Sequence, residues 1–509
     1  MVWNRALKDR FENESGAVLK DWGGQLPVAV VFPNTYRIGM SNLGVHALYK
    51  WLNDHDDFLA ERVFWDEQEL STSGALSVES RRPLTDFSVV AFSVSWELDY
   101  FNIPRILRAA GLPVYSRDRD ESHPLIIGGG ATLTANPAPA APFFDAVCIG
   151  EAEAILPDLL DTLKGSLNVP RRDILEQLTK LPGIYVPGHS QSAVKRRYNT
   201  DMNTFPIGTT IFTNDTEFGD MYLLEAQRGC RYSCRFCLVA GAFCPFRWRS
   251  VEVLLKEAEN NLQYRKCVAL VGPVVSEHPQ IVALLQGLRE LGFHLSMGSM
   301  RVNPISTEVL AELVKGGVKS VTIAPEAGND RLRRSIGKGF SDNDVIEAVS
   351  KIGAAGIRQL TLYSMVGLPG ETDEDAADLA ALVIRCKAEA DKYRLLLSLN
   401  VSAFIPKPQT SFERKPMANT TEINPRLEML SRTLPPRGVK VKPDNTDWGL
   451  VQATLSRGDE RLAGVIEKMD RVSLAGWRRA MKQQGLSAEN YAHRRFDDKE
   501  PLPWNVVEM

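Results

Sequence analysis

The sequence predicts an α/β protein with two parallel-sheet domains followed by a mainly helical C-terminal region. Three observations lead to this prediction. The first third alternates short β-branched strands with helical stretches, a second series of strand and helix repeats lies between residues 217 and 410, and four of the seven cysteines fall between positions 230 and 244. The 509 residues are long enough for more than one buried core.

Composition excludes several classes of protein. A formal net charge of -3 gives no global field for gathering polyanions. No stretch approaches the roughly 18 consecutive apolar residues of a membrane span, and residues 1–16 are too charged for a secretory signal. An odd number of cysteines in such a chain argues against a disulfide framework. We therefore expect a cytoplasmic protein with no membrane partner.

The first predicted domain, residues 1–167, is a doubly wound parallel sheet. Its clearest strands are Pro27–Phe32, Phe87–Ser95, Leu125–Ile127 and Ala146–Ile149. Ligands of such sheets bind in a crevice at the carboxyl ends of the strands. Four segments lie at those ends and could share one crevice: Asn34–Gly44, Ser93–Glu97, Gly128–Thr132 and Gly150–Glu153.

The second predicted domain, residues 217–410, follows a connector at 168–216. Its six strand candidates are Tyr222–Ala226, Val268–Val271, His294–Met297, Ser320–Ala324, Gln359–Met365 and Leu395–Phe404. Because a full eightfold barrel needs about 250 residues, this series predicts a partial (β/α)6 barrel. Residues 411–509 then form a helical accessory region, with Trp504 as a packing anchor.

The segment RGCRYSCRFCLV carries the most specific motif of the chain. It places Cys230, Cys234 and Cys237 in Cys-x3-Cys-x2-Cys spacing directly after the first barrel strand. Three thiolates on a compact loop can hold three irons of a 4Fe-4S cluster and leave the fourth iron open for another ligand. The alternative is a zinc site in which Cys244 supplies a fourth thiolate.

These cysteines, with Phe236 just before the third, resemble the signature of the radical S-adenosylmethionine (radical SAM) superfamily. The resemblance implies that S-adenosylmethionine chelates the open iron and is cleaved to a 5'-deoxyadenosyl radical. It also implies a reducing electron donor. The metal ligands would be Cys230, Cys234 and Cys237, and Phe236 would lie at the cofactor.

Further candidate cofactor contacts follow later barrel strands. Arg301 could bind the cofactor carboxylate with its planar guanidinium, and Ser299 lies beside it in SMGSMRVNP. Glu326 could accept hydrogen bonds from the cofactor, and Gly367 in MVGLPGET would let the backbone approach the adenine. The alternatives are a surface salt bridge for Arg301, a helix-start carboxylate for Glu326 and a simple turn for Gly367.

The front domain resembles the cobalamin-binding branch of the superfamily, on PNTYRIGMSNLG, SVSWELDYFNIPRILRAAGLPVYSRDR and IIGGGATLTANPAPAAPFFDAVCIGEAEA. Near the end of the chain, SRGDERL and EPLPW resemble the same branch. This likeness implies a cobalamin-binding-like Rossmann domain. Its candidate corrin contacts are Ser93, Ser95, Gly128, Gly129 and Glu153. Two departures stand out. The turn Asn34–Gly39 lacks the histidine that lies beneath cobalt in other cobalamin enzymes, and Ala152 stands where the branch often has glycine.

The expected function is a radical SAM enzyme, with cobalamin-dependent methyl transfer to a carbon centre as the first hypothesis. The alternatives are another radical outcome, such as ring formation, rearrangement or RNA modification, and a non-catalytic iron-sulfur or corrinoid-binding protein. The substrate could be a small molecule or RNA. Residues 407–442 hold eight Lys or Arg against three Glu, which could contact phosphates or form a solvated face. The sequence does not indicate an oligomeric state or a catalytic acid or base.

Overall fold

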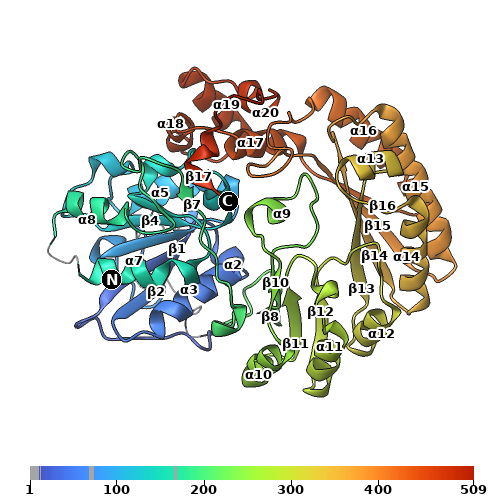
Figure 1. Ribbon diagram of the computed structural model, residues 1–509, viewed down its shortest axis with the longest axis horizontal. Coiled ribbons are helices and arrows are strands. Elements are labelled where there is room, and N and C mark those ends of the chain that lie inside the picture. Colours follow the sequence, from blue (N-terminus) through green and yellow to red (C-terminus); the bar gives the residue numbers. More distant parts are fainter. Residues whose placement is uncertain (1–10, 12, 68–70, 72–73, 166–168) are drawn as a thin grey trace.

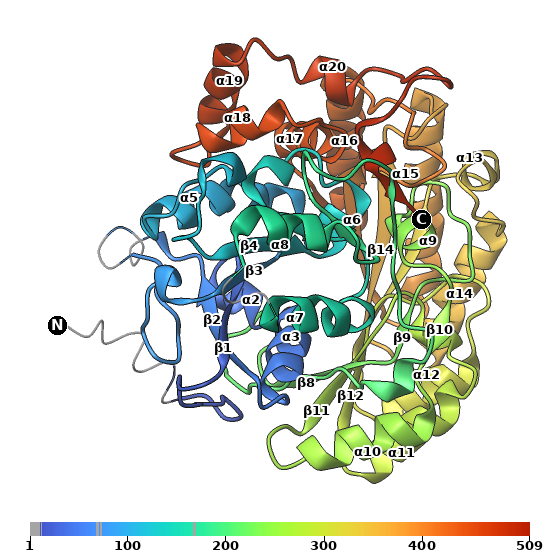
Figure 2. The same ribbon diagram turned by 60° about the vertical axis from the view of Figure 1, so that its left-hand side comes forward.

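The computed structural model describes residues 11, 13–67, 71, 74–165 and 169–509. It has the predicted α/β architecture. In Figure 1 the front domain lies on the left, the barrel strands and their helices on the right, and the C-terminal helices at the top. Figure 2 shows the same helices covering one end of the front domain.

The front domain is built on one six-stranded sheet with the order β2-β1-β3-β4-β5-β6. Every pair is parallel except β5 with β6, which is antiparallel. The order reverses between β1 and β3, and ligands of doubly wound sheets bind at such a switch point. The strands are β1 (Leu26–Phe32), β2 (Phe58–Phe64), β3 (Val89–Ser93), β4 (Leu125–Gly129), β5 (Ala146–Cys148) and β6 (Ile184–Tyr185).

Strand β2 was not predicted, because charged residues interrupt its apolar pattern. Arg62 is fully buried in the middle of this strand, and its guanidinium contacts Glu14 at 2.7 Å and Glu79 at 2.6 Å. Two carboxylates therefore neutralise a charge that the sequence pattern assigns to the surface.

Helices cover both faces of the front sheet, which confirms the doubly wound arrangement. One face packs against α3 (Leu43–Asn53), α7 (Leu156–Lys164) and α8 (Arg171–Leu178). The other face packs against α5 (Asn102–Ala109), and the C-terminal helices share that core. Helix α8 and strand β6 lie within the predicted connector, so the sheet extends beyond residue 167.

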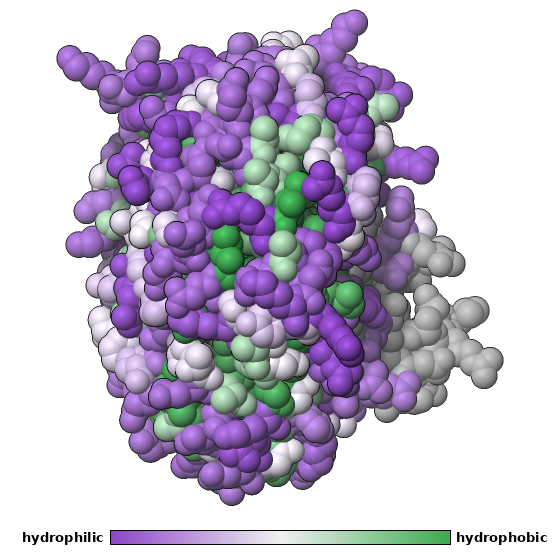
Figure 3. All heavy atoms as spheres, turned by 90° about the vertical axis from the view of Figure 1, so that its right-hand side faces the viewer, coloured by the Kyte–Doolittle hydropathy of each residue, from purple (hydrophilic) through white to green (hydrophobic). Residues whose placement is uncertain are grey.

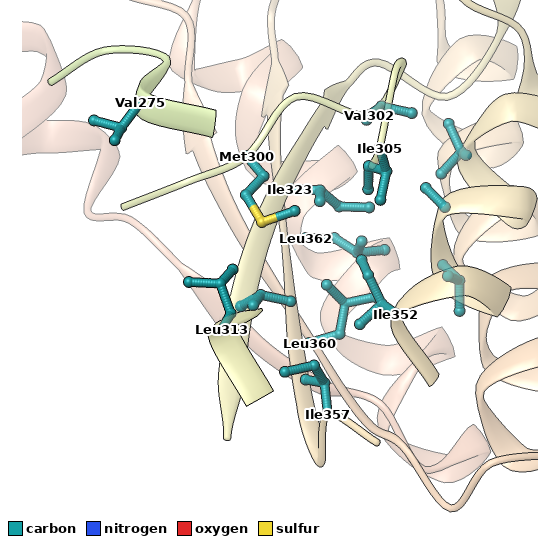
Figure 4. Packing of buried hydrophobic residues seen from close by; sticks show 14 of the residues in the cluster. Val275, Met300, Val302, Ile305, Leu313, Ile323, Ile352, Ile357, Leu360 and Leu362 are labelled. Atoms are coloured by element: carbon teal, nitrogen blue, oxygen red, sulfur yellow. The ribbon is translucent and has the colours of Figure 1, made fainter. Parts of the chain in front are cut away.

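The second domain contains all six predicted barrel strands, but they form two separate sheets. One has the order β12-β11-β8, and the other begins β13-β14-β15. Among the residues that the structure describes, one isolated bridge, between Met300 and Ile323, connects them, and Figure 4 shows both side chains in the apolar core. The barrel is therefore partial. Its strands are β8 (Met221–Glu225), β11 (Cys267–Val271), β12 (His294–Met297), β13 (Ser320–Glu326), β14 (Gln359–Val366) and β15 (Leu396–Ala403).

The C-terminal region is mainly helical and also contributes a strand to the barrel. Strand β16 (Lys440–Pro443) pairs in parallel with β15, beyond the predicted boundary at residue 410. Trp504 is 1% exposed and donates its indole N–H to Glu413 at 2.7 Å, so it anchors the region as expected. The helices are α16 (Thr420–Thr433), α17 (Thr446–Ser456), α18 (Leu462–Glu467), α19 (Leu474–Gln483) and α20 (Glu489–Ala492).

The surface on the barrel side is largely hydrophilic, as Figure 3 shows for the face at the right of Figure 1. Among the helices that the structure describes, none is long and apolar enough to cross a membrane.

Candidate functional site

The cysteine loop, residues 229–237, and helix α9 (Leu238–Ala242) lie between the two strands of a β-hairpin. The hairpin pairs β9 (Gln227–Arg228) with β10 (Arg247–Trp248). Gly229 has φ of 69°, and a Cβ there would lie 2.4 Å from the Pro245 carbonyl oxygen, so only glycine fits this turn. The Arg235 N–H donates to the Ile336 carbonyl at 3.0 Å, which fixes the loop to the segment after α13 (Asp330–Ser335).

The three motif cysteines are partly exposed on this loop and carry free thiols. Burial is the largest cause that raises the pKa of both the Cys230 and Cys237 thiols. Cys244 differs in its contacts, because its thiol donates to the Ala240 carbonyl at 3.1 Å. Over the described ranges, no three His, Cys, Asp or Glu side chains converge on a point that could hold a single metal ion.

Phe236 packs into a small apolar cluster between the loop and the ends of the later barrel strands. This contact holds the loop against that side of the barrel. The cluster consists of Ala327, Leu332, Ile336, Leu368, Phe404 and Phe412, with Phe236 and Met365 packed against it.

Arg301 lies next to the cysteine loop with an uncommitted guanidinium group. Its Cζ lies 3.3 Å from the ring centroid of Tyr232, whose hydroxyl donates to Glu277 at 2.7 Å. The Arg301 Nε is buried without a hydrogen-bond partner, and the described residues provide no carboxylate within ion-pair distance. The surface salt bridge considered from the sequence is therefore not formed. Ser299 is exposed in the same segment.

Glu326 and Gly367 lie at the carboxyl ends of β13 and β14. Glu326 has φ of 66° and accepts a hydrogen bond from Lys338 at 2.9 Å, so its carboxylate already has a partner. Gly367 has φ of 79°, and its N–H donates to Glu371. Burial raises the pKa of Glu371 to about 7, against the opposing effect of the Gly367 N–H and Arg426.

One cavity of about 560 Å³ joins the carboxyl ends of the front sheet to the beginning of the cysteine loop. All four predicted strand-end segments contribute to it. Its inner part is lined by aliphatic side chains of the sheet, α3 and α7, and its polar part includes Ser93, Ser95, Gly128, Gly129 and Glu153. The structure thus brings these five candidate residues together, while their contact with a cofactor stays a prediction.

Two carboxylates of the front domain pair with arginines of the hairpin. Arg228 contacts Glu153 at 2.7 Å and Glu151 at 2.8 Å, and Arg247 contacts Glu151 at 2.6 Å. Burial would raise the Glu151 pKa, but the Arg247 hydrogen bonds and the Arg228 charge lower it overall. We call these four residues, together with Glu225, which contacts Arg228 at 2.8 Å, the seam cluster.

Sequence reasoning missed the seam cluster apart from Glu153. Arg228 and Glu151 stand within quoted motifs, but nothing in a single sequence shows that the two segments meet. At Gly150 a Cβ would lie 2.0 Å from the Arg197 carbonyl oxygen, whereas Ala152 fits a 3-10 turn. Ala152 does not have a positive φ, so the backbone at this position does not require a glycine.

The turn Asn34–Gly39 does not reach the cavity. Tyr36 is buried, and its ring packs against Phe64 with centroids 5.2 Å apart. The Asn34 side chain donates to Asp99 at 2.7 Å. The cavity wall near this turn is instead formed by Asn42, Leu43 and Gly44.

Comparisons with known proteins agree with this geometry. Residues 44–187 match the family of N-terminal domains of radical SAM proteins, and residues 224–383 match the radical SAM superfamily. An uncharacterized protein of Methanocaldococcus jannaschii is 29% identical over 86% of this chain and 90% of its own length. A threonylcarbamoyladenosine tRNA methylthiotransferase of Treponema pallidum is 25% identical over 43% of this chain and 46% of its own.

A solved structure has a similar fold over most of the chain. It is the radical S-adenosylmethionine methyltransferase TsrM of Kitasatospora setae, with cobalamin and a [4Fe-4S] cluster bound. The TM-score is 0.56, with 13% identity, covering 91% of this chain and 99% of that one. The likeness extends across both domains, so the order of front domain and partial barrel is shared.

Proposed function

The chain belongs to the radical SAM superfamily, and we propose that it is a cobalamin-dependent enzyme that transfers a methyl group to a carbon atom of its substrate. The observation that carries this proposal is the cavity that runs from the switch point of the front sheet to the beginning of the cysteine loop. A cofactor in that cavity would lie next to the loop that carries the three cysteines.

The cysteine loop fits a 4Fe-4S cluster better than a zinc ion. Cys230, Cys234 and Cys237 are free thiols on one fixed loop, whereas the Cys244 thiol already donates to backbone carbonyls of α9. Three thiolates leave one iron open. When bound, the cluster with S-adenosylmethionine supplies a carbon radical, and cobalamin supplies a transferable methyl group.

The chain's own residues would bind and orient these groups. Arg301 offers a guanidinium without an ion-pair partner in the described chain, held flat on Tyr232, and this fits a ligand carboxylate. Ser299, Glu326, Gly367 and Phe236 surround the same end of the barrel. Glu326 would act together with Lys338, because the two already form an ion pair.

The arrangement of apolar and polar groups in the cavity suits cobalamin. Its aliphatic inner part suits the flat heteroaromatic base of the nucleotide tail. Its polar part, which holds Ser93, Ser95 and the backbone of Gly128 and Gly129, suits the amide-bearing edge of the corrin. Glu153 would contribute through Arg228, which it already binds.

Product analysis after anaerobic reconstitution tests the reaction. The full chain is supplied with iron, sulfide, methylcobalamin, a reductant and S-adenosylmethionine, and nucleoside products are quantified by mass spectrometry. We expect 5'-deoxyadenosine together with S-adenosylhomocysteine whose amount depends on cobalamin. Formation of 5'-deoxyadenosine alone would favour another radical outcome, such as ring formation or rearrangement. Formation of both products with S-adenosylhomocysteine independent of cobalamin would favour a reaction like that of the methylthiotransferase relative. A verified cluster without either product in the presence of candidate substrates would favour a binding protein.

Single cysteine variants distinguish the cluster from zinc. Cys234→Ala should abolish the iron-sulfur absorbance of the reconstituted protein, because a cluster on two thiolates is not retained. Cys244→Ala is the matched control and should keep both the iron content and the absorbance. Equal loss of bound metal in the two variants, with zinc rather than iron recovered, would contradict the assignment.

A further inference from the structure

Gln227 has a buried carboxamide with no hydrogen-bond partner. The residue is 1% exposed, and neither its Nε2 nor its Oε1 contacts a donor or acceptor within the described part of the chain. Buried polar groups in folded proteins nearly always have partners, and an unsatisfied group costs about 1–3 kcal/mol. A carboxamide with both groups unpaired therefore indicates a missing partner.

The backbone around Gln227 is shaped to accommodate this side chain. Gly272 lies opposite, and a Cβ there would approach the Gln227 Cγ to 2.5 Å. Gln227 lines the same cavity as the front-domain strand ends, together with Gly272 and Pro273 on the barrel side. The space that could provide the missing partner is thus the proposed cofactor cavity.

A single partner of suitable chemistry would satisfy both groups. The Nε2 needs an acceptor and the Oε1 needs a donor, and another primary carboxamide presents both in one plane. The corrin ring carries such carboxamides around its edge. An ionised carboxylate or phosphate offers only acceptors, so such a ligand would leave the Gln227 Oε1 without a donor.

We propose that Gln227 is a positioning residue that binds a peripheral carboxamide of the corrinoid through a paired amide contact. This inference rests on the proposed cobalamin function and extends it to the barrel side of the cavity. Gln227 immediately precedes Arg228 and lies three residues before Cys230. The contact would therefore connect the orientation of the corrin to the hairpin that carries the cysteine loop.

Cofactor binding and apoprotein stability, measured on the same variants, test the proposal. Hydroxocobalamin is titrated into the full chain by its visible absorbance, and thermal unfolding is followed without cofactor. Gln227→Met keeps the length of the side chain but removes both polar groups. We expect its affinity for hydroxocobalamin to fall about tenfold or more, while its apo unfolding midpoint stays equal or rises.

Asn136→Leu is the matched control, because Asn136 is a buried amide whose Nδ2 donates to the Ser456 carbonyl at 3.0 Å and the Gly458 carbonyl at 2.9 Å. It should lower the apo midpoint and leave hydroxocobalamin affinity unchanged. Gln227→Glu keeps one acceptor and should give an affinity between those of wild type and Gln227→Met.

Two results would overturn the inference about Gln227 without refuting the cobalamin proposal. They are a Gln227→Met affinity within twofold of wild type, and a fall in its apo midpoint like that of Asn136→Leu. Failure of the wild-type chain itself to bind hydroxocobalamin would instead refute the cobalamin proposal, so the two failures are distinguishable.

Discussion

Arg228 and Arg301 both flank the cysteine loop, but their surroundings differ. Arg228 contacts three carboxylates, of Glu151, Glu153 and Glu225, and its pKa is raised well above the usual value although burial alone would lower it. Arg301 contacts no carboxylate of the described chain and lies on the ring of Tyr232. The first arrangement joins two domains, while the second leaves a charge available to a ligand.

This difference distinguishes a residue that stabilises the fold from a residue that binds a ligand, although both lie beside the cysteine loop. Removal of a fully paired buried charge leaves its partners unsatisfied, and stability falls. Removal of an unpaired group leaves no protein partner unsatisfied, so stability is kept and only the affinity for the ligand falls. The same contrast separates Asn136 from Gln227.

The largest expected stability effect is at the seam cluster. Arg228→Met would leave the nearly buried Glu151 and Glu153 with less compensating charge, and we expect a loss of about 3–5 kcal/mol in the free energy of unfolding. Urea denaturation at pH 7.5 measures it. Arg231→Met, at an exposed arginine nearby, should cost less than about 1 kcal/mol. Similar losses at the two positions would remove the distinction between the seam cluster and an ordinary surface pair.

Arg301→Met should show the reverse pattern. We expect the free energy of unfolding to change by less than about 1 kcal/mol, whereas affinity for S-adenosylmethionine falls by about tenfold to a hundredfold, because a charge-assisted contact is lost. Equilibrium dialysis on the reconstituted protein gives the affinity. Arg301→Lys should not restore it fully, since the ammonium lacks the planar fork. Unchanged affinity in both variants would assign Arg301 to packing on Tyr232 alone.

The effect of Asp99 on stability depends on pH. Burial raises its pKa to about 7, with the Asn34 hydrogen bond opposing and the Glu97 charge adding to the rise. Between pH 4 and 7 the native state therefore binds the proton that the unfolded state has lost, so Asp99 lowers stability as the pH rises through this window. Asp99→Asn should add up to about 4 kcal/mol at pH 8 and almost nothing at pH 4. A gain of equal size at both pH values would contradict the shift.

Much of the fold follows from local pattern, and the exceptions have physical causes. The six barrel strands could be placed because their apolar residues repeat with clear periods. Strand β2 could not be predicted because Arg62 and Glu61 are buried in it, and their partners lie far away in sequence. Strand β16 is short and largely exposed, so no apolar pattern distinguishes it.

The candidate site was predictable where chemistry requires fixed spacing. The three cysteines must lie close together on one loop, and strand ends of a parallel sheet meet at one edge, so both could be located from the sequence. Gln227 could not, because an amide becomes informative only when the structure shows that nothing pairs with it. Lys338 likewise becomes relevant to Glu326 only through the fold. The predicted domain boundaries and cofactor contacts remain predictions.

The pairing of β17 (Val507–Glu508) with β7 (Val194–Lys195) has a consequence for biosynthesis. The next residue of the connector, Arg196, donates its backbone N–H to the Glu508 carbonyl at 2.7 Å, and its side chain donates to the carbonyl of Cys244. On the ribosome, β7 emerges long before its partner strand. The connector beside the cysteine loop can therefore adopt its final pairing only after β17 has been synthesised, and metal loading before that point would meet a loop whose surroundings are incomplete.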